Sequence, residues 1–354
     1  MENRTVVAVD IAKNVFEIAV SEIPGQVSRR ERLSRSAFLD FFKQIPPAIV
    51  VMEACGSATY WGRQIELLGH TVTLLPAHHV RPYITRNKTD RTDAKGILEA
   101  YRNKDLRPVP MKTPDQQVVA AIHRFRSGWI SSRTAQVNTL RGLLREIGVV
   151  IPMGIEKVLP QVRMLLEERA SLPLGHADSA VPDPLRPMVA SACDQIEALT
   201  QQIKQADREL AKIANRIPEV VRLLSIPGIG VIVATAFFSS VGDVHRFPSG
   251  RHLASYLGLT PRERSSGNTR RFGRISKRGN PYLRMQLVHG ARSVLCHAKR
   301  AKSHDRLRLW GLTLLGRTSH NKAAVALASK LARIAWAVLK HDRPYESLPV
   351  TVAA

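Results

Sequence analysis

The first hundred residues alternate between short apolar runs and amphipathic segments. Three strand-like runs, each separated from the next by a few residues, predict an antiparallel meander over residues 5–10, 15–21 and 26–33. The segments that follow are expected to alternate as helix 36–45, strand 48–52, helix 60–68, strand 71–75 and helix 93–101. A meander followed by alternating helices and strands predicts a mixed sheet with helices on its faces.

From about residue 106 the pattern changes to long helices. Prolines interrupt the chain at 108, 110 and 114, after which a helix is expected over 115–147 and a second over 189–217. Apolar residues of the second helix repeat at spacings of three and four, which makes a heptad seam of Ile196, Leu199, Ile203, Ala206, Leu210, Ile213 and Ile217. This seam either packs against the 115–147 helix of the same chain or forms a helix-mediated dimer.

The chain of 354 residues is long enough for two or three domains, each with its own core. The changes of pattern predict an α/β domain over 1–105, a helical coiled-coil and linker region over 106–217, and a mainly α C-terminal domain over 218–354.

The net charge indicates which class of partner the chain binds. The chain holds 53 Lys and Arg against 29 Asp and Glu, a net charge of +24, which indicates a polyanionic partner such as nucleic acid. No apolar run approaches the length of a membrane span, and we expect neither a membrane partner nor a signal peptide before the first strand. The cysteines, Cys55, Cys193 and Cys296, are far apart and are interpreted as free thiols of a cytoplasmic protein.

Four acidic residues are candidates for a metal site. Asp90 and Asp93 lie three residues apart at an expected helix start, where Thr89 can act as the cap. Asp10 and Glu53 each end an apolar strand, where an isolated charge is costly unless it is paired or bound to a metal. Asp90 and Asp93 alone could equally complement the helix macrodipole. Taken together, the four carboxylates favour a divalent cation.

The segment 223–230 reads LLSIPGIG and precedes an expected helix over 231–240. Glycines at 228 and 230 would let backbone amides approach a phosphate, and the N-terminus of the following helix favours an anion. Gly228 and Gly230 therefore indicate a helix-hairpin-helix that contacts the DNA backbone, although a simple turn between helices fits the same residues.

A basic block follows between residues 262 and 284, with eight Lys or Arg and one acid. The candidate nucleic-acid ligands in it are Arg262, Arg264, Arg270, Arg271, Arg274, Lys277 and Arg278. One interpretation is a loop that only grips phosphates. The other is a serine nucleophile among arginines, with Ser266 favoured because Gly267 permits a sharp turn and Ser265 as the alternative.

The chain resembles the DEDD transposases of the Piv/MooV invertase group, the insertion-sequence recombinases that use a bridge RNA. The resemblance covers nearly the full length and rests on the segments VDIAKNVFEIAV, VMEACGSATY, RNKTDRTDA, IPGIG, RFPSGRHLASYLGLTPRERSSGN and GRISKRGNPYLR. It implies an N-terminal RuvC-like domain of the RNase H fold, a helical coiled-coil segment, and a C-terminal transposase domain.

The resemblance also implies roles for five residues. The acidic tetrad of the family falls on Asp10, Glu53, Asp90 and Asp93, which would bind Mg²⁺, and its serine falls on Ser266. That serine would attack a DNA phosphate and form a covalent intermediate. The implied activity is RNA-guided cutting and rejoining of DNA strands by the transposase of an insertion sequence.

The implied partners are double-stranded target and donor DNA and a structured bridge RNA. The resemblance implies a homodimer or homotetramer whose active site combines the RuvC-like domain of one protomer with the transposase domain of another. The protein would act in the bacterial cytoplasm, on the nucleoid.

Two other functions fit parts of the sequence. A RuvC-like, Mg²⁺-dependent nuclease or Holliday junction resolvase would use the four carboxylates to activate water and the C-terminal domain only to grip DNA. The arginines around Ser266 and Gly267 argue against that reading. A nucleic-acid-binding protein without catalysis would use the acids structurally.

Overall fold

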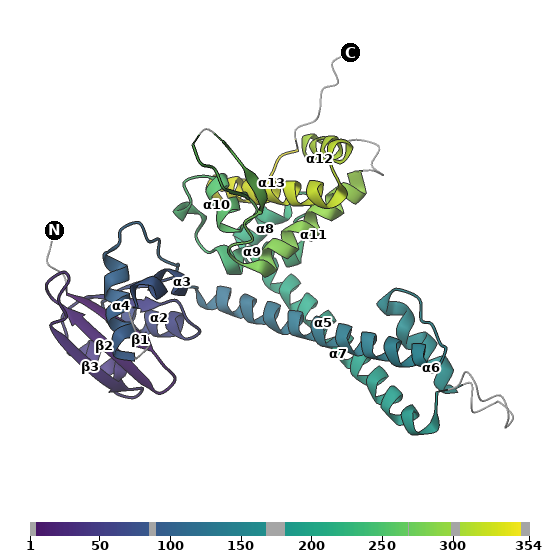
Figure 1. Cartoon of the computed structure of the whole chain (residues 1–354), viewed down its shortest axis with the longest axis horizontal. Helices are drawn as coiled ribbons and strands as arrows, with labels where there is room; N and C mark the ends of the chain where they lie inside the picture. The colour runs from purple at the N-terminus through teal and green to yellow at the C-terminus, as the bar shows by residue number, and fades with distance from the viewer. Residues whose placement is uncertain (1–4, 85–89, 168–180, 268, 299–304, 348–354) are drawn as a thin grey trace, which may run out of the picture. The chain divides into compact units, whose positions relative to one another are not determined.

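The computed structural model describes residues 5–84, 90–167, 181–267, 269–298 and 305–347, with the side chains of Asp90 and Arg91 left out. The chain divides into two compact units, residues 1–113 and 114–354, each of which is described by itself (Figure 1). Residues 106–113 belong to the first unit, where Val109 bridges to Leu74. The three-part division at residues 105 and 217 stays a prediction.

The first unit contains a five-stranded sheet in the order β3-β2-β1-β4-β5. Its strands are β1 (Val6–Ile11), β2 (Val15–Ser21), β3 (Arg29–Ser34), β4 (Ile49–Glu53) and β5 (Thr71–Leu75). Strands β1 to β3 are antiparallel, and β1, β4 and β5 are parallel, so the predicted mixed sheet is confirmed. Strand β3 begins at Arg29 rather than at residue 26, and its charged sequence RRERLS suits an exposed sheet edge.

Helices cover both faces of this sheet. They are α1 (Phe38–Lys43), α2 (Ala58–Leu67), α3 (Ala77–Val80), the 3₁₀ turn η1 (Arg81–Tyr83) and α4 (Asp90–Arg102). Helices α1 and α2 bury Phe38 and Trp61 against Phe16 of β2, with the Phe16 and Phe38 rings 4.2 Å apart. Helices α3 and α4 pack on the opposite face, where Ala94 and Ile97 are buried.

The second unit is mainly helical, as predicted. Its long helices are α5 (Pro114–Glu146) and α7 (Arg186–Ala214), with η2 (Ile155–Lys157), α6 (Val158–Glu167) and η4 (Asp183–Leu185) between them. The remaining elements are α8 (Pro218–Leu224), α9 (Val231–Val241), η5 (Val244–Arg246), α10 (Gly250–Tyr256), β6 (Pro261–Glu263), β7 (Phe272–Ile275), α11 (Pro281–Ala298), α12 (Arg306–Arg317) and α13 (His320–Lys340). Of the helices described, none combines the length and apolar character needed to cross a membrane.

Helices α5 and α7 pack along each other within the chain (Figure 1). Ile196, Ile203 and Leu210 of the seam are buried, and Arg126 of α5 forms an ion pair of 2.6 Å with Asp207 of α7. The seam therefore packs within one chain, and the helix-mediated dimer stays a prediction.

A buried histidine ties α5 to the C-terminal helices. His123 is 4% exposed, with Nε2 3.0 Å from Thr235 Oγ1 of α9 and Nδ1 3.0 Å from the Tyr282 hydroxyl of α11. Thr235 Oγ1 donates to the Val231 carbonyl, so it accepts from Nε2, and Nδ1 accepts from Tyr282. Burial, and then the charge of Arg126, lower the pKa of His123 to about 4.

This histidine is expected to make folding pH-dependent. Its pKa is about 4 in the folded chain and ordinarily 6.5, so between these values the unfolded chain binds the extra proton. Stability is therefore lost as the pH falls from 6.5 towards 4, by about 3 kcal/mol in total. Urea unfolding of the full chain at several pH values measures this loss. His123→Gln should be less stable at neutral pH but should lack this component, and an unchanged pH slope in the variant would contradict the assignment.

Candidate active-site residues

Asp10 and Glu53 lie on neighbouring parallel strands. Val9 of β1 is in register with Met52 of β4. Asp10 and Glu53 are the next residues on these strands, so they lie beside each other at the same end of the sheet. Side chains alternate between the faces of a strand, and Ala8 and Val51 belong to the core beneath α4. Asp10 and Glu53 are two residues further along and therefore lie on the α4 face, where both are half-buried.

Helix α4 brings a third carboxylate to this face. The helix packs on β1 and β2, and Ala94 and Ile97 form its buried surface against the sheet. Asp93, one residue before Ala94, is only 7% exposed. Asp90 is the first residue of α4, but its side chain and residue Thr89 lie outside the described part of the chain.

The donor set at this end of the sheet fits a hard divalent cation in its chemistry. Asp10, Glu53 and Asp93 offer only carboxylate oxygens, which are the ligands that Mg²⁺ prefers. Within the described side chains, however, no group of three or more His, Cys, Asp or Glu is arranged closely enough to hold a metal. The tetrad includes Asp90, whose side chain is outside that search, so the four-carboxylate metal site stays a prediction.

Further polar residues near these carboxylates were not identified from the sequence. Glu17 of β2 pairs directly with Asp10, so the two acids share a face, and Arg32 of β3 forms an ion pair of 3.4 Å with Glu17. The alternation VFEIAVS could have revealed Glu17, since glutamate occupies an inward position of an apolar strand.

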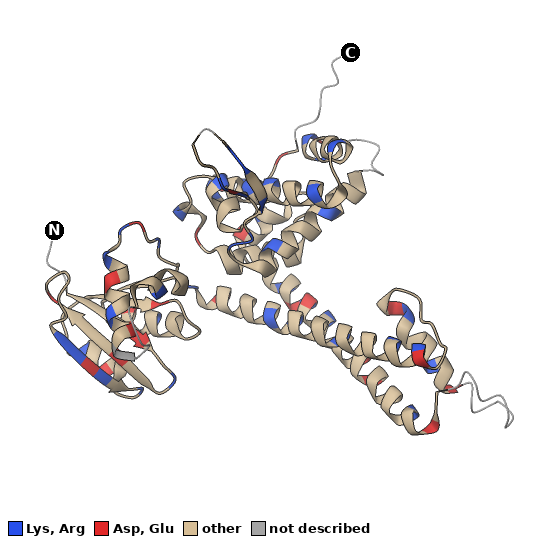
Figure 2. Cartoon of the chain, viewed as in Figure 1, with Lys and Arg blue, Asp and Glu red and all other residues tan. Residues whose placement is uncertain are grey.

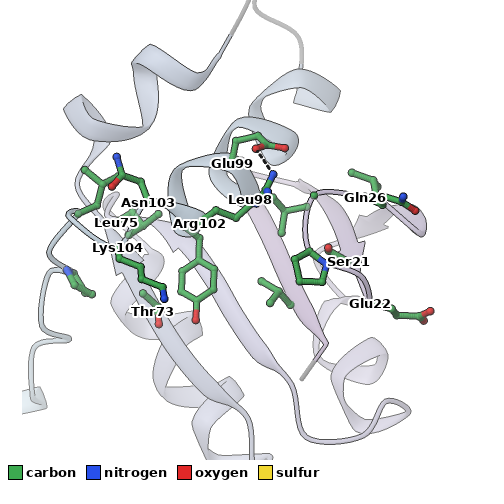
Figure 3. A pocket seen from close by; sticks show the side chains of 17 residues that line it. Ser21, Glu22, Gln26, Thr73, Leu75, Leu98, Glu99, Arg102, Asn103 and Lys104 are labelled. Atoms are coloured by element: carbon green, nitrogen blue, oxygen red, sulfur yellow. Dashed lines mark hydrogen bonds and ion pairs between the residues drawn. The ribbon is translucent and has the colours of Figure 1, made fainter. Parts of the chain in front are cut away.

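A hollow in the first unit is separate from these acids, none of which lines it. It has a volume of about 500 Å³ and lies around the C-terminal end of α4, where Glu99 and Arg102 form an ion pair of 3.0 Å (Figure 3). Arg102 is nine residues beyond Asp93, roughly 13 Å along the helix axis. This hollow therefore does not belong to the carboxylate site.

In the second unit, Ser266 lies on the turn between β6 and β7. Its backbone pairs with that of Thr269, whose carbonyl accepts a hydrogen bond of 3.3 Å from the Ser266 amide. Gly267 follows with φ of +55°, in the left-handed region that favours glycine. Ser266 is exposed, and within the described residues its hydroxyl makes no hydrogen bond.

Ser265 differs from Ser266 in its partners. The Ser265 hydroxyl donates to Glu263 Oε1 at 2.7 Å and accepts from the Arg271 amide at 3.3 Å, while Arg270 Nε lies 3.2 Å from the same carboxylate oxygen. Hydrogen bonds from Ser265 and Arg270 lower the pKa of Glu263, so the acid is charged. Ser265 thus helps to hold the hairpin, and Ser266 is the serine that is open to a ligand.

The hairpin is strongly basic (Figure 2). A hollow of about 610 Å³ beside it is lined by five of the candidate nucleic-acid ligands, Arg262, Arg264, Arg271, Arg274 and Lys277. Arg270 is turned to Glu263 instead, and Arg278 is exposed, with its carbonyl accepting from Arg284. These positions can surround a phosphate with positive charge.

The two glycines between α8 and α9 have different surroundings. Gly228 has φ of +85°, and a Cβ there would lie 2.7 Å from the Gly290 carbonyl of α11. A glycine is therefore required at 228 by packing. Gly230 is the exposed N-cap residue of α9, with open space around its Cα, so only this position is free to approach an anion. The helix-hairpin-helix stays a prediction.

The chain matches two family models and several curated transposases. The family model described as "Transposase IS116/IS110/IS902 family" matches residues 220–307, and a DEDD transposase model of IS110 type, described as "Transposase", matches residues 7–149. The chain is 39% identical to a "Probable family 20 transposase" of Pseudomonas aeruginosa, over 97% of this chain and 99% of the relative. It is 37% identical to the "Transposase for insertion sequence element IS1111A" of Coxiella burnetii, over 98% and 92%, and 35% identical to the "Transposase for insertion sequence element IS1328" of Yersinia enterocolitica, over 96% and 97%.

The matched family models place this combination of an acidic α/β unit and a basic helical unit in a class of enzymes that act on DNA, the DNA transposases. The relatives that the chain matches over nearly their whole length are also named transposases. The chain belongs to the IS116/IS110/IS902 family of insertion-sequence transposases, as the resemblance of its motifs predicts.

Proposed function

We propose that this transposase cuts and rejoins DNA strands through a covalent phosphoserine intermediate at Ser266. The observation that carries the proposal is the exposed Ser266 on the β6–β7 turn, followed by Gly267 with positive φ, on a hairpin whose strands line a hollow with arginines. A nucleophile must come close to the phosphorus of the DNA backbone, and a side chain at an exposed hairpin end can do so.

The reaction is a transesterification. The Ser266 oxygen forms a bond to phosphorus, the bond from phosphorus to one deoxyribose oxygen breaks, and the hydroxyl proton passes to solvent or to the leaving oxygen. A second strand end then attacks the phosphoserine and releases the serine, so each step exchanges one phosphate ester for another without a nucleotide energy source. Arg262, Arg264 and Arg271 would stabilise the negative charge that develops on the phosphate oxygens.

We propose further that the first unit is a RuvC-like domain of the RNase H fold. Its strand order β3-β2-β1-β4-β5, with three antiparallel strands followed by two parallel ones, supports this proposal. Asp10, Glu53 and Asp93 on the α4 face, together with Asp90, would hold Mg²⁺, which supplies charge to polarise the scissile phosphate. Glu17 would orient Arg32 and raise the negative potential of that face.

The family resemblance leads us to propose a structured bridge RNA as the guide, with double-stranded target and donor DNA as substrates on the bacterial nucleoid. A net charge of +24 with only 5% aromatic residues favours contacts to phosphate backbones over base stacking, which suits a protein whose specificity comes from base pairing. A coiled-coil homodimer or homotetramer would bring the two kinds of active-site residue together from different protomers.

The test is a search for a covalent adduct. The full chain, purified with its co-bound RNA, is incubated with Mg²⁺ and labelled DNA that spans the element junction, and denaturing electrophoresis detects protein attached to DNA. Mass spectrometry of the adduct should place the phosphate on Ser266. Cleaved DNA without an adduct would favour the nuclease or junction resolvase, in which the carboxylates activate water.

A further inference from the structure

A broad groove crosses the second unit next to the β6–β7 hairpin. Its volume is about 1470 Å³, and its floor is one side of α13, formed by small and apolar residues such as Val325, Ala326 and Ala337. The walls are the start of α10, strand β7 and Trp310 of α12. All of these elements belong to one compact unit, so the groove is a feature of that unit alone.

The charges that line this groove are all positive. They come from three elements, with Arg251 on α10, Arg274 on β7, and Lys322, Lys330 and Arg333 on α13; no carboxylate lies among the described lining residues. Lys330 is half-buried, with its Nζ 4.2 Å from the centre of the Trp310 ring. Burial, and then the neighbouring Arg333, lower the pKa of Lys330. An anion in the groove would relieve this repulsion between cations.

The combination of cations with an apolar floor distinguishes between kinds of nucleic acid. A duplex presents its phosphates but keeps its bases stacked inside, so it would leave the floor of α13 exposed to water. An unpaired strand offers both parts, because its phosphates can meet the cations while its bases and sugars cover apolar and aromatic surface.

The groove adjoins the basic hollow beside the β6–β7 hairpin. Strand β7 separates them, and Gly273, Arg274 and Ile275 line both. A strand whose phosphate lies at the hairpin can therefore continue over β7 onto α13. Gly273 has no side chain to block this path, and a Cβ placed there would approach no atom closer than 3.8 Å.

We propose that this groove binds an unpaired stretch of the DNA strand adjacent to the phosphate that Ser266 attacks. The inference rests on the proposed function, since it takes DNA as the substrate of the hairpin. It adds a strand-holding site on α13 that would keep the cut strand and its neighbouring bases in place during exchange.

The test compares two pairs of substitutions in the full-length Ser266→Ala protein, which separates binding from adduct formation. Lys322→Gln with Arg333→Gln removes two exposed charges from the groove. Lys204→Gln with Arg216→Gln removes two exposed charges, one on α7 and one in the turn that follows it, as the matched control outside the groove. Fluorescence anisotropy measures binding of labelled oligothymidine of about 20 nucleotides, a duplex of equal length, and the corresponding RNA.

The groove pair is expected to bind oligothymidine on the order of 20-fold more weakly at roughly 0.1 M salt. Loss of two phosphate contacts should also lower the slope of log Kd against log salt by about 1.4. The control pair should change both quantities much less, and thermal unfolding should show both pairs folded.

Equal weakening by the two pairs would overturn the proposal, because the effect would then come from net charge alone. A larger loss for the duplex or for RNA than for oligothymidine would also overturn it. Failure of the Ser266 adduct in the wild-type protein would refute the proposed reaction but would leave these affinities as measured, so the two failures are distinguishable.

Discussion

The Ser266→Ala variant is expected to form no covalent protein–DNA adduct and to lose strand exchange by a factor on the order of 10⁴ or more, because the attacking oxygen is removed. Folding should be unaffected. The side chain is exposed, and the Ser266–Thr269 contacts that hold the turn are made by backbone atoms, which alanine retains. Affinity for DNA should also be kept, since the cations around the hairpin remain.

Ser265→Ala is the matched control for this prediction. It removes a hydroxyl of the same size from the neighbouring residue, together with the hydrogen bond to Glu263. The hairpin should loosen and the rate should fall modestly, but the adduct should still form on Ser266. An adduct that survives in Ser266→Ala and disappears in Ser265→Ala would assign the nucleophile to Ser265 instead.

Asp10→Asn is expected to lower strand cleavage by on the order of 10³-fold or more, with Glu53→Gln acting in the same direction. Each substitution keeps the shape of the side chain but replaces a charged ligand by a weak neutral one, which removes most of the attraction for a divalent cation. Cleavage by the wild-type protein should likewise stop when a chelator removes Mg²⁺. Quenched time courses on labelled junction DNA measure these losses.

The stability of Asp10→Asn separates a metal-binding role from a structural one. Asp10 pairs with Glu17 on the neighbouring strand and lies at the same end of the sheet as Glu53. Without a metal, these like charges repel one another. The asparagine variant should therefore unfold at an equal or higher temperature in chelator. Asp40→Asn, on the exposed surface of α1, is the control and should leave cleavage unchanged. A marked loss of stability in Asp10→Asn would instead assign the acid a structural role.

The elements of both units follow closely from local pattern. Strands β1, β2, β4 and β5 differ by at most a residue or two at either end from the runs that predict them, because alternating burial leaves a period of two in the sequence. Strand β3 is less well predicted, since a charged edge strand such as RRERLS has no apolar face to mark its start. The long helices α5 and α7 are recovered because their apolar positions repeat at helical spacing.

Some residues of the candidate site can be predicted from the sequence, whereas their partners cannot. The acids at strand ends and the serine before a glycine are visible as residue types at particular places in a run, so Asp10, Glu53 and Ser266 could be named without coordinates. The partners of these residues could not. Glu17 opposite Asp10, and Glu263 as the acceptor for Ser265, depend on strand register, which a single sequence does not specify.

Local sequence therefore determines which segments are strands or helices, which residues carry chemistry, and that the partner is an anion, since periodicity, residue type and net charge are properties of the chain itself. Tertiary packing decides which of these residues meet. The bond between His123 and Tyr282 joins positions 159 residues apart, and the cationic groove gathers α10, β7, α12 and α13 around one hollow. Such contacts form because distant apolar faces are buried together, and no local pattern encodes the resulting neighbours.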